Sequence, residues 1–131
     1  MEIRSAHTRL FVSDIAVCAA FYRDVLKFKV IVLQIEKGYA EFEIANLRLS
    51  LFRQQEMAEI LRTSGLPLAD NCQDKFGLIL QVHDLDGIYH ELRKADVDFA
   101  EPPTQNAEFA LKVAYCRDPE GNLIGLFESV M

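Results

Sequence analysis

The stretch TRLFVSDI at residues 8–15 indicates a short strand followed directly by a helix. Residues 8–12 are rich in strand-forming types, and their alternation places His7, Arg9 and Phe11 together on one face. The serine and aspartate that follow can cap a helix, because a side-chain oxygen there accepts hydrogen bonds from the free amides of the first turn. The rest of the predicted fold is built around this strand-to-helix junction.

Three more strands are predicted after the helix. The apolar stripe that is typical of a helix continues to residue 26. Lys37-Gly38 and Ala45-Asn46 then mark turns between segments rich in strand formers. We therefore expect the helix over residues 15–26 and strands over residues 28–35, 39–44 and 47–52.

The second half of the chain repeats this order. Like residues recur at a constant spacing of 70 positions, which pairs Val12 with Val82, Asp14 with Asp84, and Ile15 with Leu85. The sequence Asp-Pro-Glu-Gly at residues 118–121 predicts a hairpin turn, because proline suits its second position and glycine closes it. We expect a helix over residues 85–92 and strands over residues 76–82, 97–100, 109–116 and 122–127.

These elements predict one α+β domain over residues 1–131, built from two tandem βαβββ modules. Module one spans residues 1–53 and module two spans residues 75–131. A polar linker at residues 54–74 joins them and could hold a short helix over residues 54–62. A single helix covers only one face of each module, so we expect the other faces to form a curved mixed sheet around a central cavity.

Composition and charge narrow the class of protein. The formal net charge of −6 argues against a nucleic-acid partner, because such proteins usually carry a basic patch. No apolar run approaches the roughly 18 residues of a membrane helix, and the first residues lack a secretory layout, so a cytoplasmic location without membrane contact is expected. Cys18, Cys72 and Cys116 are odd in number and widely spaced, which favours structural thiols over a zinc ribbon or a redox pair.

Several segments resemble the vicinal oxygen chelate superfamily. They are the junction at residues 7–14, Phe21-Tyr22, the Leu-Lys-Phe at residues 26–28, and the closing segment DPEGNLIGLFE at residues 118–128. That superfamily includes glyoxalase I, extradiol dioxygenases, fosfomycin-resistance enzymes and bleomycin-resistance proteins. The resemblance covers nearly the whole chain apart from the linker. It implies the two-module fold and a homodimer.

In the metal-dependent members, the resemblance implies a divalent ion held by four equivalent strand positions, here His7, Ser50, Gly77 and Gly125. Only His7 is a usual metal ligand, because a hydroxyl and two glycines supply neither imidazole nor carboxylate. Glu128 lies an odd number of residues beyond Gly125, so it is expected on the opposite face of its strand. We predict no cofactor and no metal site. His7 is the only retained metal candidate.

The predicted cavity lining combines aromatic, apolar and a few polar side chains, which is typical of a small-molecule pocket. Arg9 is costly to bury alone, so it either pairs internally, with Glu41 or Glu43, or meets an acidic ligand. The catalytic residues, if any, are not identified. The expected ligand-binding residues are His7, Arg9, Phe11, Arg48, Ser50, Phe52, Gln81, Leu123 and Phe127.

Three functions fit these observations. The leading hypothesis is a metal-independent small-molecule-binding protein similar to the bleomycin-resistance branch. An alternative is a glyoxalase-like lyase or dioxygenase whose metal ligands come from atypical positions or from a partner chain. The third is a non-catalytic interaction module with a collapsed cavity.

Overall fold

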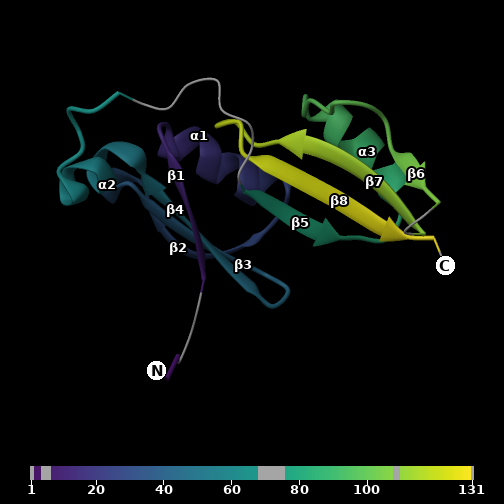
Figure 1. Cartoon of the computed structure of the whole chain (residues 1–131), viewed down its shortest axis with the longest axis horizontal. Coiled ribbons are helices and arrows are strands. Elements are labelled where there is room, and N and C mark those ends of the chain that lie inside the picture. The colour runs from purple at the N-terminus through teal and green to yellow at the C-terminus, as the bar shows by residue number, and fades with distance from the viewer. Residues whose placement is uncertain (1, 4–6, 68–75, 108–109, 131) are drawn as a thin grey trace. The chain divides into compact units, whose positions relative to one another are not determined.

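The two halves of the chain each build a separate four-stranded sheet, as the computed structural model shows (Figure 1). The structure describes residues 2–3, 7–67, 76–107 and 110–130. The chain divides into two compact units, residues 1–70 and residues 71–131. We call them the first and the second unit and describe each by itself.

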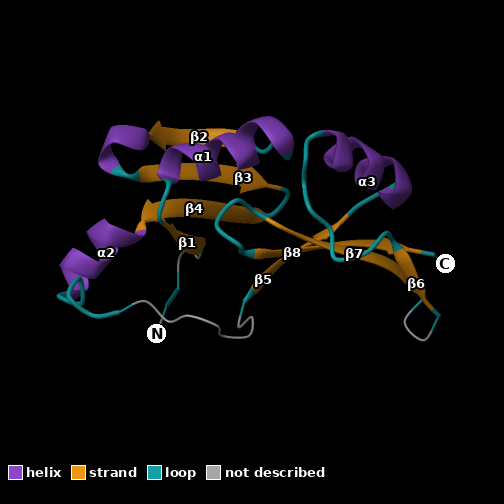
Figure 2. Cartoon of the chain, turned by 90° about the horizontal axis from the view of Figure 1, so that it is seen from above, coloured by secondary structure: helices purple, strands orange, loops and turns teal. Residues whose placement is uncertain are grey.

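The first unit contains four strands, which are β1 (Thr8–Val12), β2 (Lys29–Gln34), β3 (Tyr39–Ile44) and β4 (Leu47–Arg53). They lie in the order β1-β4-β3-β2, in which β1 runs parallel to β4 and the other neighbours are antiparallel. Helix α1 (Ile15–Ala20) covers one face of this sheet (Figure 2). The side chains that fill the space beneath it are fully buried, among them Val12, Cys18, Phe42, Leu49 and Leu51.

Helix α1 begins as predicted but ends in a different conformation. Asp14 provides the cap, because its Oδ1 accepts a hydrogen bond of 3.1 Å from the Val17 amide. The predicted helix over residues 15–26 is α-helical only to Ala20 and continues as the π-helical turn η1 (Phe21–Val25). The wider turn coincides with an aromatic cluster around the buried Tyr22, whose ring lies 5.5 Å from that of Phe28.

A turn and a second helix complete the first unit. A 3-10 turn, η2 (Ile35–Lys37), ends at Gly38, which has a left-handed φ of 74°. Helix α2 (Gln54–Leu61) starts directly after β4 and packs against β4 and β1. The helical start of the predicted linker therefore belongs to the first unit. Residues 68–74 of the predicted polar linker lie outside the described residues, and these include Cys72.

The second unit repeats the same topology with β5 (Gly77–Gln81), β6 (Thr104–Asn106), β7 (Leu111–Arg117) and β8 (Leu123–Ser129). Their order is β5-β8-β7-β6, and β5 runs parallel to β8. Helix α3 (Leu85–Lys94) lies over one face of this sheet (Figure 2). The predicted α+β fold with two βαβββ modules is confirmed as two separate mixed sheets. The shared cavity stays a prediction.

One predicted strand of the second unit is wrong. Residues 97–100 contribute only a single bridge, between Phe99 and Cys116, and the strand paired with β7 is β6. The Val97 amide donates to the Leu92 carbonyl, so this segment is still tied to the end of α3. The apolar residues there pack instead of pairing, as the Phe99 ring lies 4.9 Å from that of Tyr89. The predicted start of β7 at Phe109 lies outside the described residues.

The turn between β7 and β8 forms as its sequence predicts. Asp118 is buried, and its carboxylate accepts hydrogen bonds from the amides of Glu120 and Asn122 at 2.8 and 2.9 Å. The Gly121 amide donates to the Asp118 carbonyl at 2.9 Å. These bonds hold the register of the two longest strands of the second sheet.

Among the described residues, no helix combines the length and the apolar character needed to cross a membrane.

Candidate functional site

The face of the first sheet opposite α1 carries a guanidinium that lies over two neighbouring aromatic rings. Arg9 and Ser50 are partners in the register of β1 and β4, and the Arg9 Nε donates to the Ser50 Oγ at 3.1 Å. The Arg9 Cζ lies 5.6 Å from the centre of the Tyr39 ring and 5.3 Å from that of Phe52. Cation–π contacts of this kind hold a guanidinium in place. Ser50 is completely buried, so its hydroxyl serves Arg9 rather than solvent.

Arg48 supplies the second cation of this face. It lies 3.5 Å from the Glu41 carboxylate and 3.6 Å from that of Glu43. The Tyr39 hydroxyl donates to the Glu41 Oε1 at 2.9 Å. Burial raises the pKa of Tyr39, and the Glu41 carboxylate adds to this effect. Glu41 and Glu43 therefore pair with Arg48 and not with Arg9, the partner that one of the two expectations gave them. Arg9 is held by Ser50 and the two rings.

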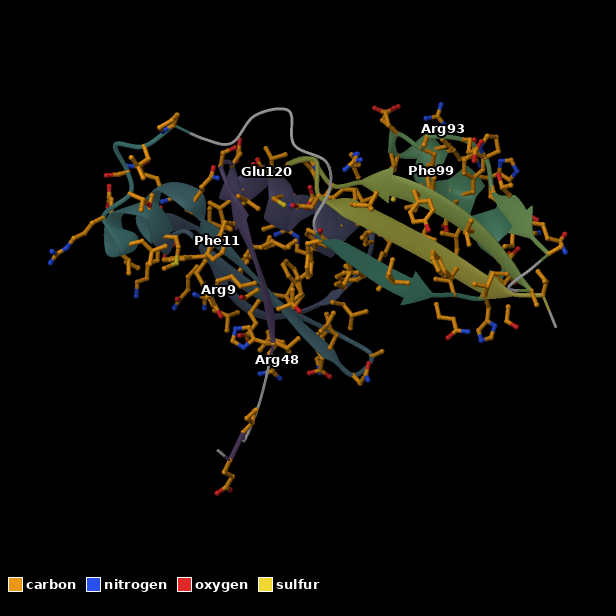
Figure 3. All side chains as sticks on the ribbon, in the orientation of Figure 1. Arg9, Phe11, Arg48, Arg93, Phe99 and Glu120 are labelled. Carbon is orange, nitrogen blue, oxygen red and sulfur yellow. The ribbon has the colours of Figure 1, made fainter. Side chains whose placement is uncertain are left out.

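Of the remaining predicted residues of the first unit, Phe11 lies on the same face and His7 precedes the strand. Phe11 is the next residue after Arg9 on this side of β1, and it remains 45% exposed. His7 is exposed and lies just before the strand begins. Figure 3 shows Arg9, Phe11 and Arg48 distributed along β1 and β4. Sequence reasoning missed Tyr39, although the register of β3 against β4 would have placed it beside Phe52.

The second unit presents an equivalent face made mainly of apolar side chains. Gln81 pairs with Phe127, and Gly77 pairs with Leu123, in the register of β5 and β8. The Tyr115 and Phe127 rings lie 5.9 Å apart and are nearly perpendicular. The predicted residues Gln81, Leu123 and Phe127 therefore lie on one face. Ile79 and Tyr115 share this face and were not predicted.

Gly125 lies at the centre of this second face, where a side chain would lie close to three neighbours. A Cβ at position 125 would lie 2.8 Å from the Ile79 Cδ1 and 3.0 Å from the Tyr115 ring. It would also lie 3.1 Å from the Phe127 ring. A contact under 3.0 Å requires an atom to shift, so a side chain at this position would require the end of the half-exposed Ile79 to move.

The four positions that the resemblance implies for a metal do not fit one. Ser50 is engaged with Arg9, while Gly77 and Gly125 have no side-chain donor. His7 is the one residue of the set with a nitrogen ligand, and a divalent transition metal needs several such donors. Within the described part of the chain, no three His, Cys, Asp or Glu residues come together as a possible metal site.

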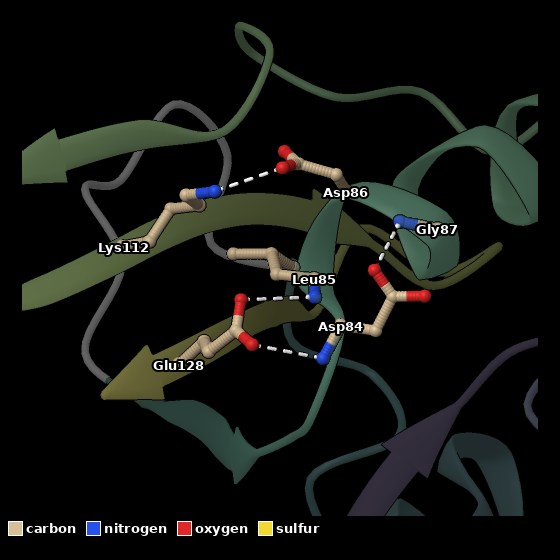
Figure 4. Close-up of polar contacts among 6 residues, drawn as sticks. All are labelled: Asp84, Leu85, Asp86, Gly87, Lys112 and Glu128. Carbon is tan, nitrogen blue, oxygen red and sulfur yellow. Dashed lines mark hydrogen bonds and ion pairs between the residues drawn. The ribbon is translucent and has the colours of Figure 1, made fainter. Parts of the chain in front are cut away.

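Glu128 has a structural role on the opposite face of β8, as its spacing predicts. Its carboxylate accepts hydrogen bonds from the amides of Asp84 and Leu85 at 2.9 and 3.1 Å (Figure 4). Both hydrogen bonds lower the pKa of Glu128, and the bond from the Leu85 amide has the larger effect. Asp84 in turn accepts from the Gly87 amide at 3.2 Å. Glu128 therefore anchors the start of α3 and takes no part in the candidate site.

The two described cysteines, Cys18 and Cys116, are buried, as the structural interpretation expects. Burial raises the pKa of Cys116 to about 11, with a smaller effect from the negative charge of Asp118. Neither thiol has the electropositive, accessible surroundings of a reactive cysteine.

Comparisons with known proteins agree with the fold. Residues 4–126 match the family model of the Glyoxalase/Bleomycin resistance protein/Dioxygenase superfamily, and the chain belongs to this superfamily. It is 32% identical over 120 residues to the uncharacterized protein YraH of Bacillus subtilis, covering 92% of this chain and 94% of that protein.

Solved structures show the same fold at lower identity. A glyoxalase/bleomycin resistance protein/dioxygenase from Nocardioides has a TM-score of 0.72 and 23% identity, over 99% of this chain and 87% of that one. A lactoylglutathione lyase from Agrobacterium tumefaciens has a TM-score of 0.68 and 20% identity, over 98% and 96% of the two chains. The description of the superfamily names both resistance proteins and enzymes. The function of this chain therefore has to be argued from the residues of its site.

Proposed function

We propose that this chain binds a small molecule without a metal, in the manner of the bleomycin-resistance branch of its superfamily. The observation that carries the proposal is the packing at the metal positions. Ser50 is buried against Arg9, and Gly125 is enclosed by Ile79, Tyr115 and Phe127. What remains on both faces is aromatic and apolar surface with a few polar groups, which suits binding better than metal-assisted chemistry.

Each unit offers a candidate ligand surface of its own. On the first, the guanidinium of Arg9 and the rings of Tyr39 and Phe52 form a rigid platform, because each group is held by the others. On the second, Tyr115 and Phe127 provide the aromatic surface. The two arginines of the first face are accompanied by Glu41 and Glu43, so this platform is close to neutral in charge. We infer a ligand recognised by stacking, with hydrogen bonds to arginine, rather than a highly charged one.

Metal content and turnover test the proposal directly. The purified protein should hold no stoichiometric divalent metal, and it should form no lactoylglutathione from methylglyoxal and glutathione with added Mg²⁺, Mn²⁺, Ni²⁺ or Zn²⁺. Robust metal-dependent turnover that is lost in His7→Ala would instead establish the glyoxalase-like alternative.

Binding is measured separately with a tryptophan reporter. The chain contains no tryptophan, so Phe52→Trp introduces a single fluorophore on the platform. We would titrate catechol, a neutral ring compound, in the presence of a chelator, with the charged phosphonate fosfomycin as the contrast. A ligand of the site should quench this fluorescence and raise the melting temperature, because binding to the native state stabilises it by mass action. Phe76→Trp, at an exposed position outside both faces, is the control. If none of these probes affects either signal, the interaction-module alternative gains and the binding proposal fails.

A homodimer is proposed as well. The strands β1 and β2 are the edges of the first sheet, and open edges of this kind favour pairing or coverage. Light scattering at several protein concentrations should give twice the mass of the chain, and a monomer at all concentrations would contradict it.

A further inference from the structure

The first unit contains a pocket that the predicted site residues do not account for. It has a volume of about 590 Å³ and lies between the end of β1, helix α2 and the segment that follows α2. This volume falls within the roughly 300–1,000 Å³ typical of small-molecule pockets. Phe11 is the only lining residue that also belongs to the predicted site.

The walls of this pocket are fixed by local hydrogen bonds. Helix α2 is anchored at its start, where Arg53 pairs with Glu56 at 2.6 Å and donates to the Ile35 carbonyl at 3.0 Å. At its end, Arg62 has a left-handed φ of 60°, and the Thr63 amide donates to the Ala58 carbonyl at 2.8 Å. This is the Schellman arrangement, which turns the chain back sharply after a helix. The segment that forms the third wall is therefore held against α2.

Apolar side chains around the pocket remain unusually exposed. Leu61 is 61% exposed and Leu66 is 66% exposed, and the half-exposed ring of Phe11 faces the same hollow. Exposed apolar surface gathered around one concavity commonly marks a binding site. Covering these side chains with a ligand would remove apolar area from water, which is the main favourable contribution to binding of this kind.

The lining also restricts the charge of the ligand. None of its residues is charged, and its polar members, such as Ser13, Gln54 and Thr63, offer only hydroxyl and amide groups. A charged ligand would lose hydration there without meeting an opposite charge, which is costly. An uncharged ligand with a few hydrogen-bonding groups loses much less.

We propose that this pocket is a second binding site, which takes an uncharged small molecule with an aromatic or aliphatic body. The site goes beyond the proposed function, because α2 and the segment after it contribute nothing to the platform around Arg9. The proposal also assigns a function to α2 and the segment after it, which interrupt the repeat between the two modules.

Two fluorescent probes with the same ring skeleton test the charge preference. N-phenyl-1-naphthylamine is neutral, whereas 8-anilinonaphthalene-1-sulfonate adds a sulfonate to that skeleton. We expect the neutral probe to bind saturably and at least about tenfold more tightly than the sulfonate, which corresponds to about 1.4 kcal/mol.

Two neighbouring residues of α2 provide a matched pair of variants. Leu61 lines the pocket, whereas Ile60 does not, and the two side chains are almost equally exposed, at 61% and 64%. Leu61→Glu should weaken binding of the neutral probe at least about tenfold, because it places a charge in the lining. Ile60→Glu should leave binding unchanged. Circular dichroism of both variants checks that the fold is retained.

Four outcomes would overturn the proposal. The first is the absence of saturable binding of the neutral probe, and the second is tighter binding of the sulfonate. The third is equal weakening by Leu61→Glu and Ile60→Glu. Binding that is lost in Phe52→Ala but kept in Leu61→Glu would assign the probe to the platform around Arg9 instead, and would therefore overturn this site without touching the proposed function.

Discussion

At the residue scale, one point of local strain lies at the end of α2. Arg62 occupies a left-handed conformation with a φ of 60°, which is unfavourable for a side chain with a Cβ. Arg62→Gly should therefore raise the free energy of unfolding by about 0.5–1 kcal/mol. This gain would be measured as a higher midpoint of urea unfolding.

Gly38 is the opposite case, because here a glycine already occupies the left-handed conformation. It has a φ of 74°, and a Cβ there would lie 2.9 Å from the Arg53 Cβ. Gly38→Ala should lower the free energy of unfolding by about 1–2 kcal/mol, because it adds both strain and a close contact. If the two variants shift the urea midpoint in the same direction, the interpretation of these turns is wrong.

The thiol of Cys116 yields a second prediction at this scale. Burial raises its pKa to about 11, and alkylation requires the thiolate. At pH 9 the smaller thiolate fraction alone should slow iodoacetamide labelling about 50-fold relative to the urea-unfolded chain. Peptide mapping by mass spectrometry reads this position separately from the other cysteines. Equal labelling rates in the native and unfolded states would show that Cys116 is accessible.

At the scale of elements, α3 depends on a carboxylate from the far end of the chain. Glu128 accepts the Asp84 and Leu85 amides, and these bonds lower its pKa below the ordinary value of 4.5. A lowered pKa stabilises the folded state at pH values above 4.5, and this contribution is lost as the pH falls through the folded-state pKa. Glu128→Gln should therefore lower the urea midpoint at pH 7, and the difference from the wild type should shrink below pH 4.5.

A matched control for this prediction lies on the same helix. Glu91 is exposed on α3 and is remote from its first turn, so Glu91→Gln should leave the midpoint nearly unchanged at both pH values. An equal effect of the two substitutions would indicate that net charge, rather than the anchoring of α3, governs the pH dependence.

At the scale of the whole molecule, the predicted single domain over residues 1–131 has a measurable consequence. Each compact unit contains roughly 60–70 residues, and a unit of that size buries too little surface to be very stable alone. We expect both units to unfold in one transition. Hydrogen-exchange mass spectrometry across a urea series should show peptides of β3 and β8 losing protection at the same midpoint. Separate midpoints would mean that the two units are independent domains.

Much of the local structure could be predicted because its signals are local. β1 and β3 have the predicted bounds, Asp14 and Asp84 cap their helices, and the turn at residues 118–121 forms as expected. The failures lie where packing competes with local preference. The helix predicted to residue 26 widens into a π-helical turn beside the cluster around Tyr22. The β-rich residues 97–100 remain attached to the end of α3, and β6 forms later in the chain.

The candidate site was predictable as a set of faces but not as a set of contacts. Alternation along β1 was enough to place Arg9 and Phe11 together, since side chains two residues apart share a face. It could not show that Arg48 pairs with Glu41 and Glu43, nor that Tyr39 lies against Arg9. Those contacts depend on which strands are neighbours and in what register, and β1 and β4 are separated by some forty residues of chain.

The sequence by itself therefore determined the order of elements, the duplication, the superfamily and the loss of the usual metal ligands at positions 50, 77 and 125. Each of these is a property of residue type and spacing along the chain. Only the tertiary structure decided that Ser50 holds Arg9, that Gly125 is enclosed by three side chains, and that a pocket lies beside α2. The physical reason is that packing space and hydrogen-bond partners come from residues distant in sequence, and folding alone brings them together.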